Sequence, residues 1–120
     1  MKILSVRQAR VGDLLMKTIA EMILRKVKDP RVEGITITGV DVSVDLKNAR
    51  IFFCMMDSSR KDEAMEGLKS AAGFLRHELK KELRLKAVPN LYFSYDESFD
   101  YGSKIDGILE TISKHEDQNS

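Results

Sequence analysis

The sequence predicts an α+β fold in which one three-stranded sheet carries all of its helices on one face. Segments with apolar residues every three or four positions alternate with segments rich in Val, Ile, Thr and aromatic residues. The expected order is helix, strand, strand, helix, helix, strand, helix. Its strand-helix-helix-strand part forms a right-handed crossover, which places two parallel strands side by side.

The composition is typical of a single intracellular domain. The 120 residues are 42% hydrophobic and 32% charged, which suits one compact core better than two. Cys54 is the only cysteine, so neither an intrachain disulfide nor a cysteine-based zinc site can form. The chain has no signal-peptide pattern and no apolar run long enough to span a membrane. We expect a cytoplasmic protein with one domain over residues 1–113 and a short, polar, flexible tail over 114–120.

Residues 7–28 should form an amphipathic helix, because their apolar side chains recur at helical spacing. These side chains are Val11, Leu14, Leu15, Ile19, Met22, Ile23 and Val27. Pro30 biases Asp29 away from helical backbone angles, so we expect the helix to end near Lys28. The corner Asp29-Pro30-Arg31 should then turn the chain.

Residues 35–44 and 49–56 should pair as an antiparallel hairpin. The apolar residues of the first strand change parity at Gly39, which predicts a β-bulge that keeps both apolar sets facing the core. The second strand is apolar on both faces, so we expect Cys54 within it to be a buried, unreactive thiol.

Two further helical stripes follow the hairpin, and Gly73 separates them. The first consists of Ala64, Met65, Leu68, Ala71 and Ala72, and the second of Leu75, Leu79 and Leu83. Glycine weakens a helix, so we expect two helices that meet at a kink at Gly73 and a cost for a bulkier side chain there. A strand over residues 91–95 and a last helix over 103–113 complete the prediction.

Four stretches of the chain, in this order, resemble the ribosome-binding factor A family of bacteria. They are Arg10-Val11-Gly12-Asp13-Leu14-Leu15, Val27-Lys28-Asp29-Pro30-Arg31, Thr36 to Leu46 with Ala49 after it, and Ala71-Ala72-Gly73-Phe74-Leu75-Arg76. The resemblance implies a type II KH-like fold in which the helix-kink motif Ala71-Ala72-Gly73 replaces the usual glycine-rich loop. It also implies a monomer without enzymatic activity that binds the small ribosomal subunit and its ribosomal RNA. From the same resemblance we expect a role in late subunit maturation, in rRNA processing and in adaptation to cold. We also expect an assembly GTPase as a further partner.

Positive charge gathers on the segment that this family would turn toward RNA. Residues 60–86 hold eight Lys or Arg and five Asp or Glu, and Arg76, Lys80 and Arg84 repeat every four residues. Such a stripe can face successive phosphates. The candidate RNA-binding residues are Lys28, Arg31, Lys69, Gly73, Arg76, Lys80, Lys81, Arg84 and Lys86. The plainer interpretation is a solvated helix face laced with Glu78 and Glu82.

Other functions find less support in the sequence. Neither His77 nor His115 has the spacing to a nucleophile or carboxylate that a catalytic triad or metal site needs, so we expect no catalytic residue, metal or cofactor. Tyr92 has the parity to lie on the open sheet face, where an aromatic ring could stack on an unpaired base. The alternative function is a protein-interaction module that uses the open sheet face or a strand edge.

Overall fold

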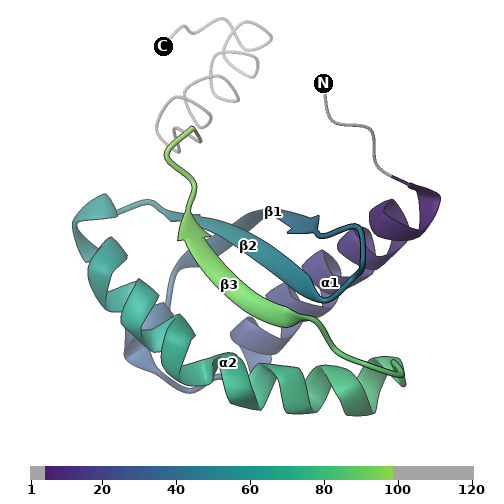
Figure 1. Cartoon of the computed structure of the whole chain (residues 1–120). Coiled ribbons are helices and arrows are strands. Elements are labelled where there is room, and N and C mark those ends of the chain that lie inside the picture. Colours follow the sequence, from purple (N-terminus) through teal and green to yellow (C-terminus); the bar gives the residue numbers. More distant parts are fainter. Residues whose placement is uncertain (1–4, 99–120) are drawn as a thin grey trace, which may run out of the picture.

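A three-stranded sheet with two long helices on one face makes up residues 5–98, the part of the chain that the computed structural model describes (Figure 1). In chain order the elements are α1 (Val6–Arg25), η1 (Pro30–Val32), β1 (Ile35–Val42), β2 (Asn48–Met55), η2 (Ser58–Arg60), α2 (Lys61–Leu83) and β3 (Asn90–Tyr95), where η marks a short 3-10 helix. The predicted α+β class is confirmed. The helix predicted over 103–113 and the tail over 114–120 lie outside the described residues.

The sheet has the strand order β1-β2-β3, with β2 in the centre. β2 runs antiparallel to β1 and parallel to β3. The hairpin and the crossover through α2 are therefore both as predicted, and β1 and β3 are the edge strands of the sheet within residues 5–98. None of the helices within residues 5–98 is long and apolar enough to cross a membrane.

The predicted bulge in β1 lies between Ile37 and Gly39, where the strand register shifts by one residue. Ile37 is paired with Phe53 of β2, and beyond the bulge Val40 is paired with Ile51. Since Phe53 and Ile51 are both fully buried, both halves of β1 point their apolar side chains to the core.

The hairpin strands end one or two residues earlier than the apolar pattern suggests. Val44 follows the end of β1 and is exposed, because Ser43 begins a turn in which its hydroxyl donates to Asp45 over 2.7 Å. Met56, the last residue of the predicted second strand, is also exposed beyond β2.

The first helix is fixed at its N-terminus by side chains that the apolar pattern does not reveal. Ser5 and Gln8 form a capping box, in which each side chain accepts from the other residue's backbone N–H. The Gln8 amide also donates to the Val42 carbonyl oxygen over 2.9 Å and so joins α1 to the end of β1. At the other end, α1 stops at Arg25 and not near Lys28.

The predicted pair of helices around Gly73 is one helix, α2, which runs without interruption from Lys61 to Leu83. Its axis changes direction along its length in Figure 1. A single glycine costs a helix only about 1 kcal/mol relative to alanine. Leu68 before Gly73 and Leu75 after it are fully buried, and packing of both halves outweighs that cost.

The core lies between the helices and one face of the sheet. Alternate residues of β2, namely Ala49, Ile51 and Phe53, are fully buried against Leu15 and Ile19 of α1 and Leu68, Leu75 and Leu79 of α2. The neighbouring Arg50 is exposed on the other face. Arg50 therefore lies on the sheet face opposite the two long helices of residues 5–98.

Cys54 in β2 is fully buried, as predicted. Burial raises the pKa of its thiol, and the nearby Asp96 carboxylate raises it further. Because the thiolate is the reactive form, the native protein should resist a thiol reagent at neutral pH and react rapidly once denaturant unfolds it. Mass spectrometry of timed labelling measures both rates, and fast labelling without denaturant would contradict the buried placement.

Candidate nucleic-acid interface

One face of α2 brings four of the predicted RNA-binding residues together. Lys69, Gly73, Arg76 and Lys80 follow one another at spacings of four, three and four, so they share one side of the helix, and all four are exposed. We call these residues the α2 basic face. Leu75 and Leu79 point the other way, into the core.

The lysines of this face have no competing partner inside the described part of the chain. No ion pair or hydrogen bond within residues 5–98 involves the side chains of Lys69 and Lys80, nor those of Arg84 and Lys86 just beyond α2. Lys81 differs, since its ammonium lies 3.6 Å from the Glu78 carboxylate. The unpaired lysines can approach phosphates without breaking an internal contact.

Arg84 leaves the stripe that its four-residue spacing predicts. It is the C-cap of α2 and has a left-handed backbone with a φ of 52°. The stripe therefore ends at Lys80, and Arg84 and Lys86 stand in the loop that leads to β3. Helical periodicity applies only within a helix, and the sequence offers no glycine to mark this end.

Arg76 connects α2 to the start of β3. Its Nε donates to the Pro89 carbonyl oxygen over 3.2 Å and its Nη2 to the Val88 carbonyl oxygen over 3.1 Å. A guanidinium has five N–H donors, so the group can fix this loop and still present charge to solvent.

Replacing Arg76 by Gln should loosen the loop before β3 and lower the free energy of unfolding by about 1 kcal/mol, the usual size of a lost hydrogen bond. Lys80→Gln is the matched control, because it removes the same charge from the same face without an internal contact, and it should change stability by less than about 0.5 kcal/mol. Urea denaturation of both variants makes the comparison. Equal midpoints for the two would mean that the Arg76 bonds hold nothing in place.

Gly73 lies on the α2 basic face with open space around it. A Cβ built at this position would meet no atom within 4 Å. The expectation that a bulkier side chain at Gly73 would be crowded is therefore wrong. Because α2 continues through Gly73, there is also no second helix N-terminus at this position whose free amides could bind a phosphate. On the α2 basic face, Gly73 therefore leaves the helix backbone without a side chain between Lys69 and Arg76.

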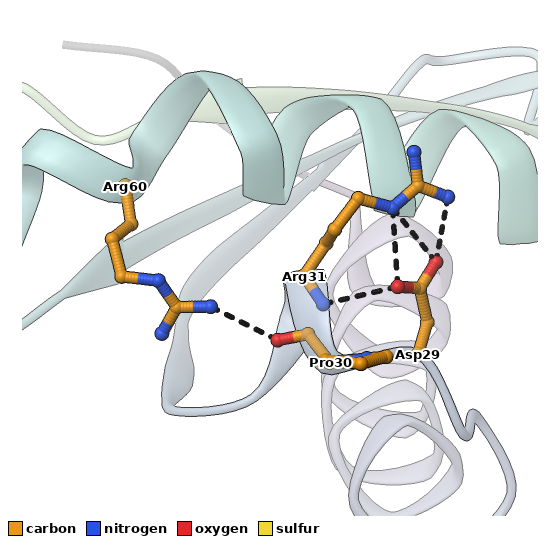
Figure 2. A network of polar contacts seen from close by, with 4 residues as sticks. All are labelled: Asp29, Pro30, Arg31 and Arg60. Carbon is orange, nitrogen blue, oxygen red and sulfur yellow. Dashed lines mark hydrogen bonds and ion pairs between the residues drawn. The ribbon is translucent and has the colours of Figure 1, made fainter.

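The corner after α1 holds Arg31 in internal contacts, which Figure 2 shows. The Arg31 guanidinium donates to both carboxylate oxygens of Asp29, the shortest contact being 2.7 Å from Nη2. Asp29 also accepts from the Arg31 backbone N–H and so caps η1. These bonds to Arg31 lower the pKa of the Asp29 carboxyl. Arg60, near the start of α2, donates to the Pro30 carbonyl oxygen over 2.9 Å (Figure 2).

Gly67 is where this corner packs against α2, a contact that no periodicity in the sequence predicts. A Cβ at Gly67 would lie 2.8 Å from Cγ1 of Val32 and 3.1 Å from Cβ of Arg31. Two residues along a helix rotate by about 200°, so Gly67 and Lys69 point to nearly opposite sides of α2. The corner and the α2 basic face are therefore separate surfaces. Lys28 belongs with the corner, where it is exposed.

Within residues 5–98, no three His, Cys, Asp or Glu side chains lie where they could hold a metal ion together. The polar groups that the structure gathers are cations on a helix face and amides or carboxylates at turns. Such a surface is suited to contact with a polyanion.

Comparisons with known proteins agree on one family. The model of the family Ribosome-binding factor A matches residues 7–109. The protein of that name from Syntrophobacter fumaroxidans is 46% identical over 113 residues, which cover 92% of this chain and 97% of the relative. Its namesake from Syntrophus aciditrophicus is 48% identical over 114 residues, with 94% and 93% covered.

Solved structures share the fold as well. The crystal structure of ribosome-binding factor A from Thermus thermophilus superposes with a TM-score of 0.66 at 24% identity, covering 73% of this chain and 94% of that one. The homology model of the Thermus thermophilus factor, as fitted into the cryo-electron microscopy map of a 30S complex, also gives 0.66 at 23% identity, covering 77% and 98%. At this identity the likeness shows the architecture alone.

Proposed function

Because the chain belongs to the ribosome-binding factor A family, we propose that it binds the small ribosomal subunit and assists its late maturation and rRNA processing. The Thermus thermophilus factor supports this proposal, since it has been fitted into a complex with the 30S subunit. The function is that of a binding protein, which stabilises one arrangement of folded ribosomal RNA and catalyses no reaction. An assembly GTPase as a further partner, a monomeric state and a cytoplasmic location complete the proposal.

The observation that carries this proposal is the α2 basic face with its unpaired lysines. Double-stranded RNA hides its base edges in a deep groove, so a helix that meets it reads mainly the backbone and its shape. Lys69 and Lys80 lie eleven residues apart on α2, which at about 1.5 Å per residue is roughly 16 Å along the helix. That span lets the two ammonium groups reach different phosphates.

The proposal is tested by co-sedimentation of the full chain with purified small subunits over a series of salt concentrations. RNA contact through phosphates releases counterions, so the logarithm of the association constant should fall linearly with the logarithm of salt, by about 0.7 to 0.9 per contact. The large subunit serves as control and should bind less. Failure to bind small subunits at low salt would contradict the proposal.

A second candidate function rests on the outer edge of β1, with which no other strand of residues 5–98 pairs. A hollow of about 750 Å³ lies between the end of α1 and the start of β1, with Ile23, Leu24 and Val27 on one side and Gly34 to Ile37 on the other. Leu24, which is 82% exposed, lines the same hollow as this edge. A peptide could add to the edge as a strand, which makes the chain a protein-interaction module. Binding through this hollow should change little with salt, unlike RNA binding.

A further inference from the structure

The open face of the sheet carries an aromatic ring beside a guanidinium. Tyr92 of β3 is aligned with Arg50 of β2 in the parallel register, so both side chains rise from the same face as nearest neighbours across the strands. Tyr92 is 54% exposed, although it occupies the middle of a strand. Within residues 5–98 the Arg50 side chain has no ion pair or hydrogen bond.

These two residues form part of a hollow of about 540 Å³ at the hairpin end of the sheet, a volume within the range of small-molecule sites. The remaining lining consists of Val42 and of three polar residues, Asp41, Ser43 and Asn48. The hollow therefore combines the Tyr92 ring with the Arg50 guanidinium and the polar side chains at the hairpin end.

Charge decides which part of a nucleotide suits this hollow. Asp41 and Arg50 lie opposite one another in the β1-β2 register and both line the hollow, so their charges offset each other and a neutral base can enter it without adding an unmatched charge. A base can stack on the Tyr92 ring and also against the plane of a guanidinium, as aromatic and Arg side chains do with unpaired bases. The phosphate of the same nucleotide then stays at the rim, near the cations of Arg50 and the exposed Lys47.

A short loop connects the end of α2 to the strand that carries Tyr92. The loop over residues 84–89 leads from α2 directly into β3, and Arg76 holds its last residues by the bonds to Val88 and Pro89. The backbone N–H of Asn90, the first residue of β3, donates to the Lys47 carbonyl oxygen over 2.8 Å. A strand of RNA that passes Lys80 and Lys86 therefore reaches the edge of β3, two residues before Tyr92.

We propose that Tyr92 and Arg50 form a stacking site for one unpaired base of single-stranded ribosomal RNA, on the sheet face opposite the helices. The proposal rests on the proposed function and adds a second contact to it. The α2 basic face holds the RNA backbone without reading sequence, and the stacking site recognises a base that has left its helix.

The test uses two fluorescent RNA probes, a single strand of ten uridines and a blunt-ended duplex without unpaired bases. Tyr92→Ala should weaken binding of the single strand by about 5- to 100-fold, the range expected for loss of one base stack, and leave binding of the duplex nearly unaffected. Tyr92→Phe keeps the ring and should bind as the parent does. Phe74→Ala is the matched control, because Phe74 is also exposed, at 44%, but lies on α2.

A second measurement does not depend on any variant. Addition of the ten-uridine strand to the parent protein should shift the NMR signals of the Tyr92 ring and of the Arg50 side chain. The stacking site would be overturned if the Tyr92 signals did not move under saturating RNA. It would also be overturned if Tyr92→Ala and Tyr92→Phe lost the same affinity for the ten-uridine strand. If Tyr92→Ala weakened small-subunit association but not RNA binding, the site would be a protein contact and the proposal would fail too.

The two proposals can fail separately. Parent protein that does not co-sediment with small subunits refutes the proposed function. The outcome is different if the parent protein co-sediments and the Tyr92→Ala variant binds subunits and single-stranded RNA as the parent does. That result refutes only the stacking site.

Discussion

Gly67→Val is expected to lower the free energy of unfolding by about 2 to 3 kcal/mol, the upper part of the range for an overpacked core. The first atom of the new side chain would lie 2.8 Å from Cγ1 of Val32. Val32 is a short, stiff side chain that is only 3% exposed, so it cannot swing away. The corner of η1 must move instead, and with it the Asp29 and Arg31 pair that packs beside Gly67.

Gly73→Val is the matched control, because it introduces the same side chain into the same helix. A Cβ at Gly73 meets no atom within 4 Å, and valine and glycine differ little in helix propensity. We expect a change of less than about 0.5 kcal/mol. Chemical denaturation followed by circular dichroism gives both values. A larger loss at Gly73 than at Gly67 would mean that α2 packs differently from the structure.

The second large effect concerns binding. Changing Lys69, Lys80 and Lys86 together to Gln removes three exposed cations without an internal partner, so the fold should stay nearly intact. The salt slope of small-subunit association should fall by about two to three on a log-log plot. If the variant and the parent bind equally at 1 M salt, this difference in slope makes the variant bind about 100- to 1,000-fold more weakly at 0.1 M salt. Co-sedimentation at several salt concentrations measures both quantities.

The control for this variant removes the same net charge from α1. Arg7, Arg10 and Lys17 are exposed there, and none belongs to the α2 basic face or to the loop after it. Changing these three to Gln should lower the slope by much less. If the salt slope fell by the same amount in the two triple variants, net charge would matter and the location of the cations on α2 would not.

The sequence was sufficient to predict most of the fold. Apolar spacing located α1, α2 and the three strands, and the parity change at Gly39 predicted the bulge, because periodicities of 3.6 and 2 follow from the backbone. Two helices that meet at a kink at Gly73 were predicted, whereas α2 is one continuous helix, since a local preference of about 1 kcal/mol was outweighed by burial on both sides. The helix over 103–113 lies outside the described residues.

The candidate site was less predictable, because a charge pattern does not reveal which cations have partners. Arg31 and Arg76 look as free as Lys69 in the sequence, yet one binds Asp29 and the other binds loop carbonyls thirteen and twelve residues away. The tight packing at Gly67 depends on a contact with η1 that lies thirty-five residues earlier in the chain. Such contacts follow from the tertiary arrangement and leave no periodic signal.

The most direct test of the account is to locate the surface that touches ribosomal RNA. A photo-crosslinking amino acid is placed at Lys80 on the α2 basic face or, in a second protein, at Lys17 on α1, and each protein is bound to purified small subunits. We expect RNA crosslinks from position 80 and few or none from position 17. RNA crosslinks from position 17, with none from position 80, would contradict the claim that α2 faces the RNA.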